Sequence, residues 1–376
     1  MKSFVRACTV LLLCRAALAQ EISAMNGAWP LWNAYVAHFL DPQGRVVDHD
    51  AGDRTTSEAQ SYALFFSLVA NDRESFERLL KWTGDNMTKG GLTNQLPGWL
   101  WGRGEDRQWK QLDVNSASDS DLWIAYTLIQ AARLWREPSL QALGEALRDR
   151  AVKEEVVAIP GLGMTLLPGN FGFHASPQVY RLNPSYLPLQ VLLGLAKDIP
   201  DSPLRKSAAS LPDILRGSSP AGYAMDWVTY HITRGFAGAQ EAGSYDAIRV
   251  YLWAGIADEE TPHRNDVLSC LHGMQTYLRN NPMAPVQVSQ AGAVTGGKSG
   301  PGFAAAVIPF LDAVNESKAR ESQVQLLKSQ FDEGTGLYGK PARYYDQNLA
   351  LFAMGWAEHR FRFDREGNLS VVWSSQ

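Results

Sequence analysis

Three short acidic segments, far apart in the chain, have the residue types that sugar chemistry requires. Their acids are Glu58, Asp119 with Asp121, and Asp246. Each acid stands among small, hydroxylated or aromatic residues at the start of an apolar helical pattern, whereas surface acids usually stand among Lys, Glu and Gln. Two carboxyl groups that face each other across a bound sugar can hydrolyse its glycosidic bond. The segments therefore indicate a cleft with acid–base chemistry.

A structural role is also open for each acid taken alone. Glu58, Asp119 and Asp121 fall in expected first helical turns, where negative charge interacts favourably with the helix dipole. Asp119 and Asp121 point to different sides of a helix, so one can face a cleft while the other braces a loop. Asp246 lies three residues before Arg249, and a structural ion pair would explain both residues.

Tryptophans beside loop residues are candidate sugar-binding platforms. The chain has 12 Trp; Trp99 and Trp101 follow a Pro-Gly pair, and Trp227 follows an aspartate in another loop. Indole rings stack on the flat C–H faces of sugars, and anchoring of the loops to the core is the structural alternative.

Other chemistries are poorly supported. The string at 292–299 fits the phosphate-binding pattern G-x-x-x-x-G-K-[ST], but Gly300-Pro301-Gly302 follows where that motif needs an uninterrupted helix. We therefore expect no nucleotide. The seven His are scattered, with no HExxH, no Cys pair and no G-x-S-x-G elbow. We expect neither a metal ion nor another cofactor.

The N-terminus has the pattern of a signal peptide. Lys2 and Arg6 precede an apolar stretch at 7–13, and Ala17-Leu18-Ala19 fits a cleavage site. We expect residues 1–19 to be removed and the protein to be periplasmic or secreted; an uncleaved membrane anchor is the alternative. Removal takes away three basic residues and no acid, so the formal charge falls from −4 to −7. Such a charge does not favour nucleic-acid binding.

Helical periodicity dominates the remaining chain. A single cysteine, Cys270, is left after the signal, so the core must supply the stability. No regular alternation of strand and helix supports a Rossmann or TIM-type fold, and no linker divides residues 20–376. We expect one all-α domain, a toroid of six helical hairpins with a C-terminal strand hairpin at 360–373. The expected helices lie near 27–40, 57–71, 73–87, 118–135, 138–155, 184–197, 204–217, 244–257, 262–280, 301–313, 317–331 and 344–359, with Ser57, Ser118 and Ser244 as caps.

Four motifs together resemble glycoside hydrolase family 8. They are Ser57-Glu58-Ala59-Gln60-Ser61-Tyr62, Ala117-Ser118-Asp119-Ser120-Asp121, Asn183-Pro184-Ser185-Tyr186 and Ser244-Tyr245-Asp246-Ala247-Ile248-Arg249. The similarity covers about residues 28–373 and includes Trp99-Leu100-Trp101-Gly102. Within the family, the chain resembles the periplasmic endoglucanases encoded with bacterial cellulose synthase.

The resemblance implies an (α/α)6 barrel that hydrolyses β-1,4-glucan internally, with inversion at the anomeric carbon. It places Glu58 as general acid, Asp246 as general base and Asp119 as the residue that holds a distorted sugar. It also implies that the cellulose synthase complex is a possible partner. Substrate-binding positions, from the resemblance and the aromatic pattern together, are Tyr62, Trp99, Trp101, Tyr186, Trp227, Tyr245 and Arg249.

The chain departs from the family pattern in having Ala59 and Ser120 where members commonly have glycine. Two alternatives remain open at this point. The protein could be a non-catalytic glucan-binding protein on the same toroid, or a chitosanase or xylanase of the same family.

Overall fold

Six inner helices lie side by side in a closed ring. The structure, a computed structural model, describes residues 29–236 and 241–375. Within it each inner helix contacts the next in chain order, and the last contacts the first. These helices are α3 (Ser57–Val69), α5 (Ser118–Trp135), α7 (Leu189–Leu195), α9 (Ile248–Ile256), α12 (Pro301–Ala313) and α14 (Tyr344–Ala357).

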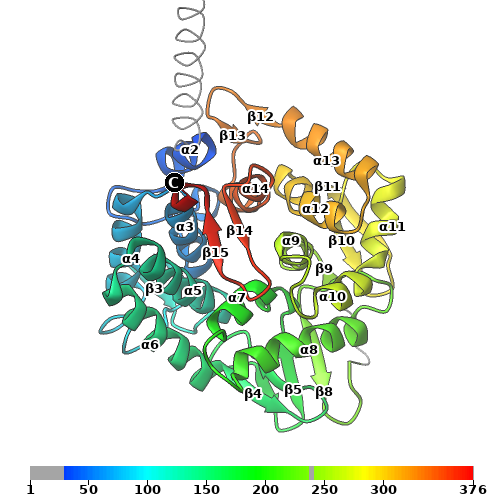
Figure 1. The fold of residues 1–376 in the computed structure, drawn as a ribbon, viewed down its shortest axis with the longest axis horizontal. Helices are drawn as coiled ribbons and strands as arrows, with labels where there is room; N and C mark the ends of the chain where they lie inside the picture. Colours follow the sequence, from blue (N-terminus) through cyan, green and yellow to red (C-terminus); the bar gives the residue numbers. More distant parts are fainter. Residues whose placement is uncertain (1–28, 237–240, 376) are drawn as a thin grey trace, which may run out of the picture.

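Outer helices cover the inner ring, and the chain runs around the barrel in sequence order (Figure 1). The arrangement is the expected (α/α)6 barrel. The outer helices are α2 (Pro30–Phe39), α4 (Arg73–Asn86), α6 (Pro138–Glu155), α8 (Pro203–Ser218), α10 (Arg264–Cys270), α11 (His272–Asn280) and α13 (Ser317–Ser329). Inner helices are apolar on nearly all sides because they pack on both neighbours and on an outer helix. In α3, for example, every residue except Glu58 is buried.

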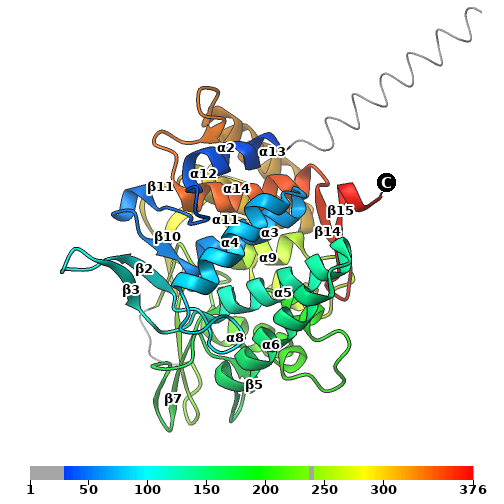
Figure 2. The ribbon, with the colours of Figure 1, turned by 90° about the vertical axis from the view of Figure 1, so that its left-hand side faces the viewer.

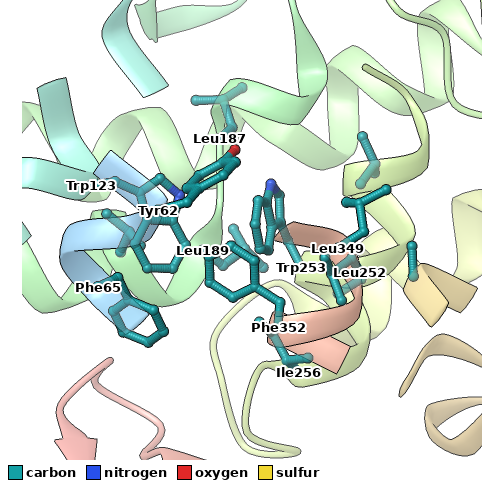
Figure 3. Packing of buried hydrophobic residues seen from close by; sticks show 14 of the residues in the cluster. Tyr62, Phe65, Trp123, Leu187, Leu189, Leu252, Trp253, Ile256, Leu349 and Phe352 are labelled. Carbon is teal, nitrogen blue, oxygen red and sulfur yellow. The ribbon is translucent and has the colours of Figure 1, made fainter. Parts of the chain in front are cut away.

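Aromatic side chains fill the axis of the ring (Figure 3). The ring centroid of Phe352 lies 4.9 Å from that of Trp253, 5.1 Å from Tyr62 and 5.2 Å from Trp123. Such pairs contribute about 0.5–1.5 kcal/mol each beyond the burial of their area. Four inner helices are thereby joined at one point, which gives the ends of those helices a rigid base.

Short antiparallel strands occupy the connections between helices. Three-stranded sheets are formed by β1–β2–β3, β6–β7–β8 and β9–β10–β11, and two-stranded ones by β4–β5, β12–β13 and β14–β15. The strands are β1 (Thr55–Thr56), β2 (Leu100–Arg103), β3 (Trp109–Asp113), β4 (Val156–Ile159), β5 (Gly163–Leu166), β6 (His174–Ser176), β7 (Val179–Leu182), β8 (Val228–His231), β9 (Ala242–Gly243), β10 (Pro285–Ser289), β11 (Val294–Lys298), β12 (Phe331–Asp332), β13 (Leu337–Tyr338), β14 (Phe361–Phe363) and β15 (Leu369–Val371).

The expected C-terminal hairpin, β14–β15, closes one end of the barrel. In Figure 1 it crosses the middle of the ring, and in Figure 2 it lies at the end opposite to β2–β3 and β10–β11. At its turn, Gly367 has φ +81° and accepts a hydrogen bond from the Tyr126 hydroxyl at 2.7 Å. A Cβ atom at Gly367 would lie 2.0 Å from the carbonyl oxygen of Gln190, so the close approach requires glycine. The open end of the barrel is therefore the end that carries the three-stranded sheets.

Three expected helices begin later or are divided in the structure. The helix expected at 184–197 is a 3₁₀ turn, η2 (Pro184–Tyr186), followed by α7, because Pro188 disfavours a helical conformation at the residue before it. The helix expected at 262–280 divides at Leu271, since the amides of Gly273 and Met274 donate to the carbonyl of Gly222. The third, expected at 244–257, begins only at Ile248.

The expected serine caps are also wrong. Thr56, one residue before Ser57, caps α3 through its side chain, which accepts the amide N–H of Ala59. The residue that precedes α5 is Ala117, which makes no side-chain cap. Ser244 donates its hydroxyl to the carbonyl of Val286 instead of capping α9.

Two further expectations concern the ends of the chain and the phosphate-binding string. The expected signal peptide, residues 1–19, lies outside the described residues. No helix among the described residues is both long and apolar enough to cross a bilayer. Residues 294–298 of the phosphate-binding string form the exposed strand β11, which pairs with β10 and is not a loop leading into a helix.

Candidate active site

The N-terminal ends of four inner helices bring the candidate residues to the open end of the barrel. Glu58 and Asp119 lie in the first turns of α3 and α5, Arg249 in the first turn of α9, and Tyr345 in the first turn of α14. Helix N-termini carry partial positive charge and stabilise nearby carboxylates. Acidic segments separated by many residues are thus gathered at one place by the topology of the ring.

Arg249 connects three carboxyl groups. Its Nη1 donates to Glu58 and, at 3.2 Å, to Oδ2 of Asp119, while Nη2 donates to Oδ1 of Asp246. The side chain of Arg249 is fully buried, whereas those of Glu58 and Asp246 are 19% and 28% exposed. The two carboxyl groups that face the cleft are therefore held by different nitrogens of one planar guanidinium, which a planar five-donor group can do and an ammonium cannot.

Hydroxyl groups complete the surroundings of this guanidinium. Nη1 also donates to the Tyr62 hydroxyl at 3.1 Å, and Nη2 donates to Oγ of Ser185 at 3.0 Å. The Tyr186 ring lies 5.5 Å from the guanidinium carbon, within range of a cation–π interaction. Ser185, which the sequence analysis did not single out as a site residue, stands directly before Tyr186 in η2.

Glu58 has the protonation behaviour of a general acid. Burial raises its pKa to about 7, and the charges of Asp119 and Asp246 act in the same direction against the lowering effect of Arg249. A carboxyl group with this pKa retains a proton in mildly acidic solution, so it can donate one to a leaving group. Among the residues that line the adjoining cleft, Glu58 is the one that belongs to α3.

Asp119 is more deeply placed. It is 2% exposed; its Oδ1 accepts the amide N–H of Ser120 at 2.7 Å, and its Oδ2 accepts from Arg249. Burial raises its pKa, while Arg249 and the amide of Ser120 oppose that shift. Its companion Asp121 does not join this group and is buried against α6 instead.

The backbone around Asp246 is held by Asp226, a residue that the sequence analysis passed over. A single oxygen of Asp226, Oδ1, accepts the amide N–H groups of Ser244, Asp246 and Ala247 at 2.7, 3.0 and 2.8 Å. This carboxylate does for the segment what a capping residue does for a helix. It explains why α9 begins only at Ile248. The sequence did not indicate this role, because Asp226 lies twenty residues before Asp246 and only the fold brings the two together.

A cleft of about 530 Å³ opens beside Glu58 and Asp246. Its walls combine tyrosines with charged side chains, a composition suited to a hydroxyl-rich ligand. Tyr245 is 52% exposed, and its backbone carbonyl accepts a hydrogen bond from the Tyr345 hydroxyl. The other lining residues are Asp48, Asp50, Ala51, Arg54, Arg343 and Tyr344, none of which was a candidate from the sequence.

The aromatic candidates fall into three environments. Tyr62 lies among the core rings of Figure 3 and reaches the site only with its hydroxyl. Trp227 stacks on Phe173, with ring centroids 5.8 Å apart, and lies 6.2 Å from Tyr186, so it adjoins the site. Tyr186 lies in η2 beside the guanidinium of Arg249, and Tyr245 directly precedes Asp246 and lines the cleft.

Trp99 and Trp101 lie at the start of the β2–β3 hairpin: Trp99 directly precedes β2, and Trp101 belongs to it. The carbonyl of Trp99 accepts the amide N–H of Ser57, which joins it to the start of α3. The ring of Trp101 stacks on Trp109 at 5.1 Å and packs edge-on against Trp82 at 5.2 Å. Trp101 thus belongs to a cluster of indoles, and sugar binding by Trp99 and Trp101 stays a prediction.

The fold is a barrel of paired helices, and its open end carries Glu58, two arginine-bound aspartates and a cleft lined by aromatic residues. Together these features define a glycoside hydrolase of the (α/α)6 type. The model of the family "Glycosyl hydrolases family 8" matches residues 1–359. An endoglucanase of Escherichia coli O157:H7 is 40% identical over 353 residues, which cover 93% of this chain and 92% of that protein. An endoglucanase of Xanthomonas axonopodis pv. citri (strain 306) is 40% identical over 365 residues, or 96% and 93% of the two chains.

A solved structure agrees with these relatives. The crystal structure of endo-1,4-D-glucanase from Vibrio fischeri ES114 has a TM-score of 0.85 at 36% identity and covers 92% of this chain and 99% of that chain. The chain belongs to glycosyl hydrolase family 8.

Proposed function

We propose that the protein is an endo-β-1,4-glucanase that cleaves internal bonds of cellulose-type chains. The observation that carries this proposal is the shared guanidinium: Arg249 binds Glu58 and Asp246 through different nitrogens at the edge of one cleft. The relatives at 36–41% identity that are named endoglucanases support the substrate class.

In the proposed mechanism Glu58 gives its proton to the glycosidic oxygen. Asp246 takes a proton from a water molecule that attacks the anomeric carbon from the opposite face, and the product inverts. Asp119 binds the sugar at the point of cleavage and stays fixed by Arg249 and Ser120. Tyr186, Trp227 and Tyr245 contact neighbouring sugar rings, and Tyr62 and Arg249 hold the acids in place.

Amide substitutions test the two acidic roles. Glu58→Gln and Asp246→Asn are each expected to reduce the release of reducing ends from carboxymethylcellulose by at least about 10³-fold, with normal far-UV circular dichroism. Glu145→Gln changes an acid of the same kind on the outer helix α6, outside the residues that line the cleft, and serves as the control. Wild-type rates in either of the first two purified variants would remove that residue from the proposed mechanism.

Product analysis tests reaction class and stereochemistry together. Nuclear magnetic resonance of cellopentaose hydrolysis is expected to show the α-anomer first, because an inverting enzyme converts a β-linkage into an α-product. Parallel assays on xylan and chitosan compare the substrates, and faster hydrolysis of either polymer than of β-1,4-glucan would contradict the assignment to glucan.

We further propose that residues 1–19 are a cleaved signal peptide, that 20–376 fold as one domain, and that the enzyme acts in the periplasm during cellulose synthesis. The N-terminal sequence pattern supports export, and the resemblance to endoglucanases encoded with cellulose synthase supports the context. N-terminal sequencing of the protein from a periplasmic fraction is expected to begin at Gln20. Retention of Met1 in the mature protein would contradict the cleavage.

A further inference from the structure

Asp121 and Glu155 form a buried pair of carboxyl groups behind the catalytic cleft. Asp121 lies in the first turn of α5, and Glu155 is the last residue of α6, the helix that packs antiparallel to α5 (Figure 2). Both side chains are 0% exposed, and both oxygens of Asp121 and Oε2 of Glu155 are buried with no hydrogen-bond donor among the described residues; the neighbour of each carboxyl group is the other carboxyl group. The proposed mechanism uses neither of them.

No cation neutralises this pair among the described residues. The nearby ionic contacts are used elsewhere, since Arg150 pairs with Glu154 and Arg249 with Asp119. The charged groups that face the pair are Asp119 and Glu154, both negative, and apart from the pair's mutual contact its one polar partner is the hydroxyl of Ser116. Ionised carboxylates only accept hydrogen bonds, so two of them cannot bond to each other without a proton. A buried pair of full charges without a counter-charge is also strongly disfavoured.

The titration behaviour agrees with this geometry. Burial is the largest cause that raises the pKa of Glu155, to about 8, while the hydroxyl of Ser116 opposes it. Burial, followed by the adjacent Glu155, raises the pKa of Asp121 well above its usual range.

The pair is attached to both sides of Asp119. The hydroxyl of Ser116 donates to Oε1 of Glu155 at 2.6 Å and accepts the amide N–H of Asn170 at 3.0 Å. Asp121 follows Asp119 by two residues in the same helical turn. A change in the pair therefore acts on the segment from Ser116 to Asp121, whose side chain at 119 contacts Arg249.

We propose that Asp121 and Glu155 share one proton, and that this proton fixes the first turn of α5 and so positions the carboxylate of Asp119 on Arg249. The two residues are positioning residues, and their bearing on catalysis rests on the proposed function. The charge of the pair is then −1, which is also the charge of an amide and a carboxylate. Either Asp121→Asn or Glu155→Gln can therefore replace the shared proton with an amide N–H.

The first test measures stability against pH, which needs no enzymatic activity. In the folded protein Glu155 holds a proton that its unfolded form, with a pKa near the usual 4.5, releases at lower pH. The folded state binds more protons in this window, so stability falls as pH rises from about 4.5 to 8. Glu155→Gln is expected to reduce the proton difference between folded and unfolded states by about one at pH 6–7, and Asp121→Asn likewise.

The matched control is Glu145→Gln, because Glu145 lies on the same helix, accepts a hydrogen bond from Gln141 and is not among the charged groups that face the pair. Its pH dependence should equal that of the wild type. Infrared spectroscopy in D2O adds a direct readout: at pH 7 the wild type should show, besides the band of partly protonated Glu58, the carbonyl band of a second protonated carboxyl, and Glu155→Gln and Asp121→Asn should lack only this second band. Unchanged pH dependence together with an unchanged band in both variants would overturn the shared proton.

The second test concerns positioning. In Glu155→Gln the amide oxygen can accept from Ser116 while the amide nitrogen donates to Asp121, so kcat should stay within about threefold of the wild type. Glu155→Ala removes both contacts, and kcat should fall at least about thirtyfold with a smaller change in KM. Equal kcat in the two variants would exclude positioning through the pair. Should Glu155→Ala not fold, Ser116→Ala replaces it under the same criterion; this variant keeps both carboxyl groups and removes the hydroxyl that joins Glu155 to Asn170.

The two proposals fail in distinguishable ways. If the wild type hydrolyses no glucan but Glu155→Gln loses the proton, the proposed function fails and the shared proton stands. If an active enzyme shows no carboxyl band that Glu155→Gln lacks, and the stability of the two proteins depends on pH in the same way, the shared proton alone fails.

Discussion

Asp226 holds the backbone of Asp246: Oδ1 of Asp226 accepts the amide N–H of Asp246 at 3.0 Å, and the same oxygen binds the amides of Ser244 and Ala247. Asp246 itself precedes α9; its carbonyl accepts the amide N–H of Arg249 at 3.1 Å, and its own amide N–H donates to Asp226 and not to the helix. The orientation of the proposed base therefore depends on a carboxylate from another loop.

Asp226→Ala is expected to lower kcat by about 10–100-fold with a smaller change in KM, the range typical of lost supporting contacts. It should also destabilise the protein by about 1–3 kcal/mol, because buried amide groups lose their acceptor. Activity on cellopentaose and urea unfolding measure the two effects. Asp364→Ala is the matched control, since Oδ1 of Asp364 likewise accepts two amides, in the turn of β14–β15 away from the cleft. A loss of kcat in Asp364→Ala as large as that in Asp226→Ala would contradict a role specific to Asp246.

Arg249→Lys tests the need for a planar guanidinium. Lysine keeps the charge but cannot bind Glu58 and Asp246 through two fixed nitrogens, so kcat should fall at least about 100-fold. Because Arg249 lowers the pKa of Glu58, a weaker contact should move the alkaline limit of activity to higher pH. The pH profile of kcat/KM checks both points. An unchanged alkaline limit would show that the guanidinium does not act on Glu58.

Ionisation of Glu58 should set the alkaline limit of glucan hydrolysis. With a pKa of about 7 in the free enzyme, the protonated form falls tenfold per pH unit above that value. We expect kcat/KM on cellopentaose at pH 9 to be about 100-fold below its value at pH 6. A β-cellotriosyl fluoride substrate needs no proton on its leaving group, so it should show no such decline, and Glu58→Gln should retain activity on it. Equal alkaline declines on both substrates would assign the limit to another group.

Trp227→Ala should weaken substrate binding more than it slows the chemical step. Trp227 stacks on Phe173 and lies 5.3 Å from the guanidinium carbon of Arg181, beside Tyr186. Loss of this aromatic platform for sugar stacking is expected to raise KM for cellopentaose about tenfold and to leave kcat within about threefold. The matched control is Trp135→Ala: Trp135 stacks on Trp373, with Arg73 at 4.7 Å, away from the cleft. A KM increase of the same size in the control would exclude a local effect.

Local sequence patterns determined most of the elements. The helices α5, α6 and α12 begin and end at the residues that periodicity predicted, because their apolar spacing and, for α6 and α12, an initial proline are signals within the segment itself. Periodicity failed where a distant group took over the backbone: Gly222 divides the helix at Leu271, and Asp226 delays the start of α9. Such contacts leave no trace in the segment that they change.

The site, like the fold, was determined partly by the sequence and partly by contacts between distant segments. The sequence by itself determined which side chains could do chemistry, since Glu58, Asp119 and Asp246 stand in unusual neighbourhoods and in motifs that resemble one family. Only the tertiary structure decided that Arg249 serves Glu58 and Asp119 as well as its helical neighbour Asp246, that Asp226 holds the backbone of Asp246, and that Asp121 turns away to pair with Glu155. The physical reason is that hydrogen bonding and burial depend on distance in space, and the closed ring of helices brings together Glu58 and Arg249, which are 191 positions apart in the chain.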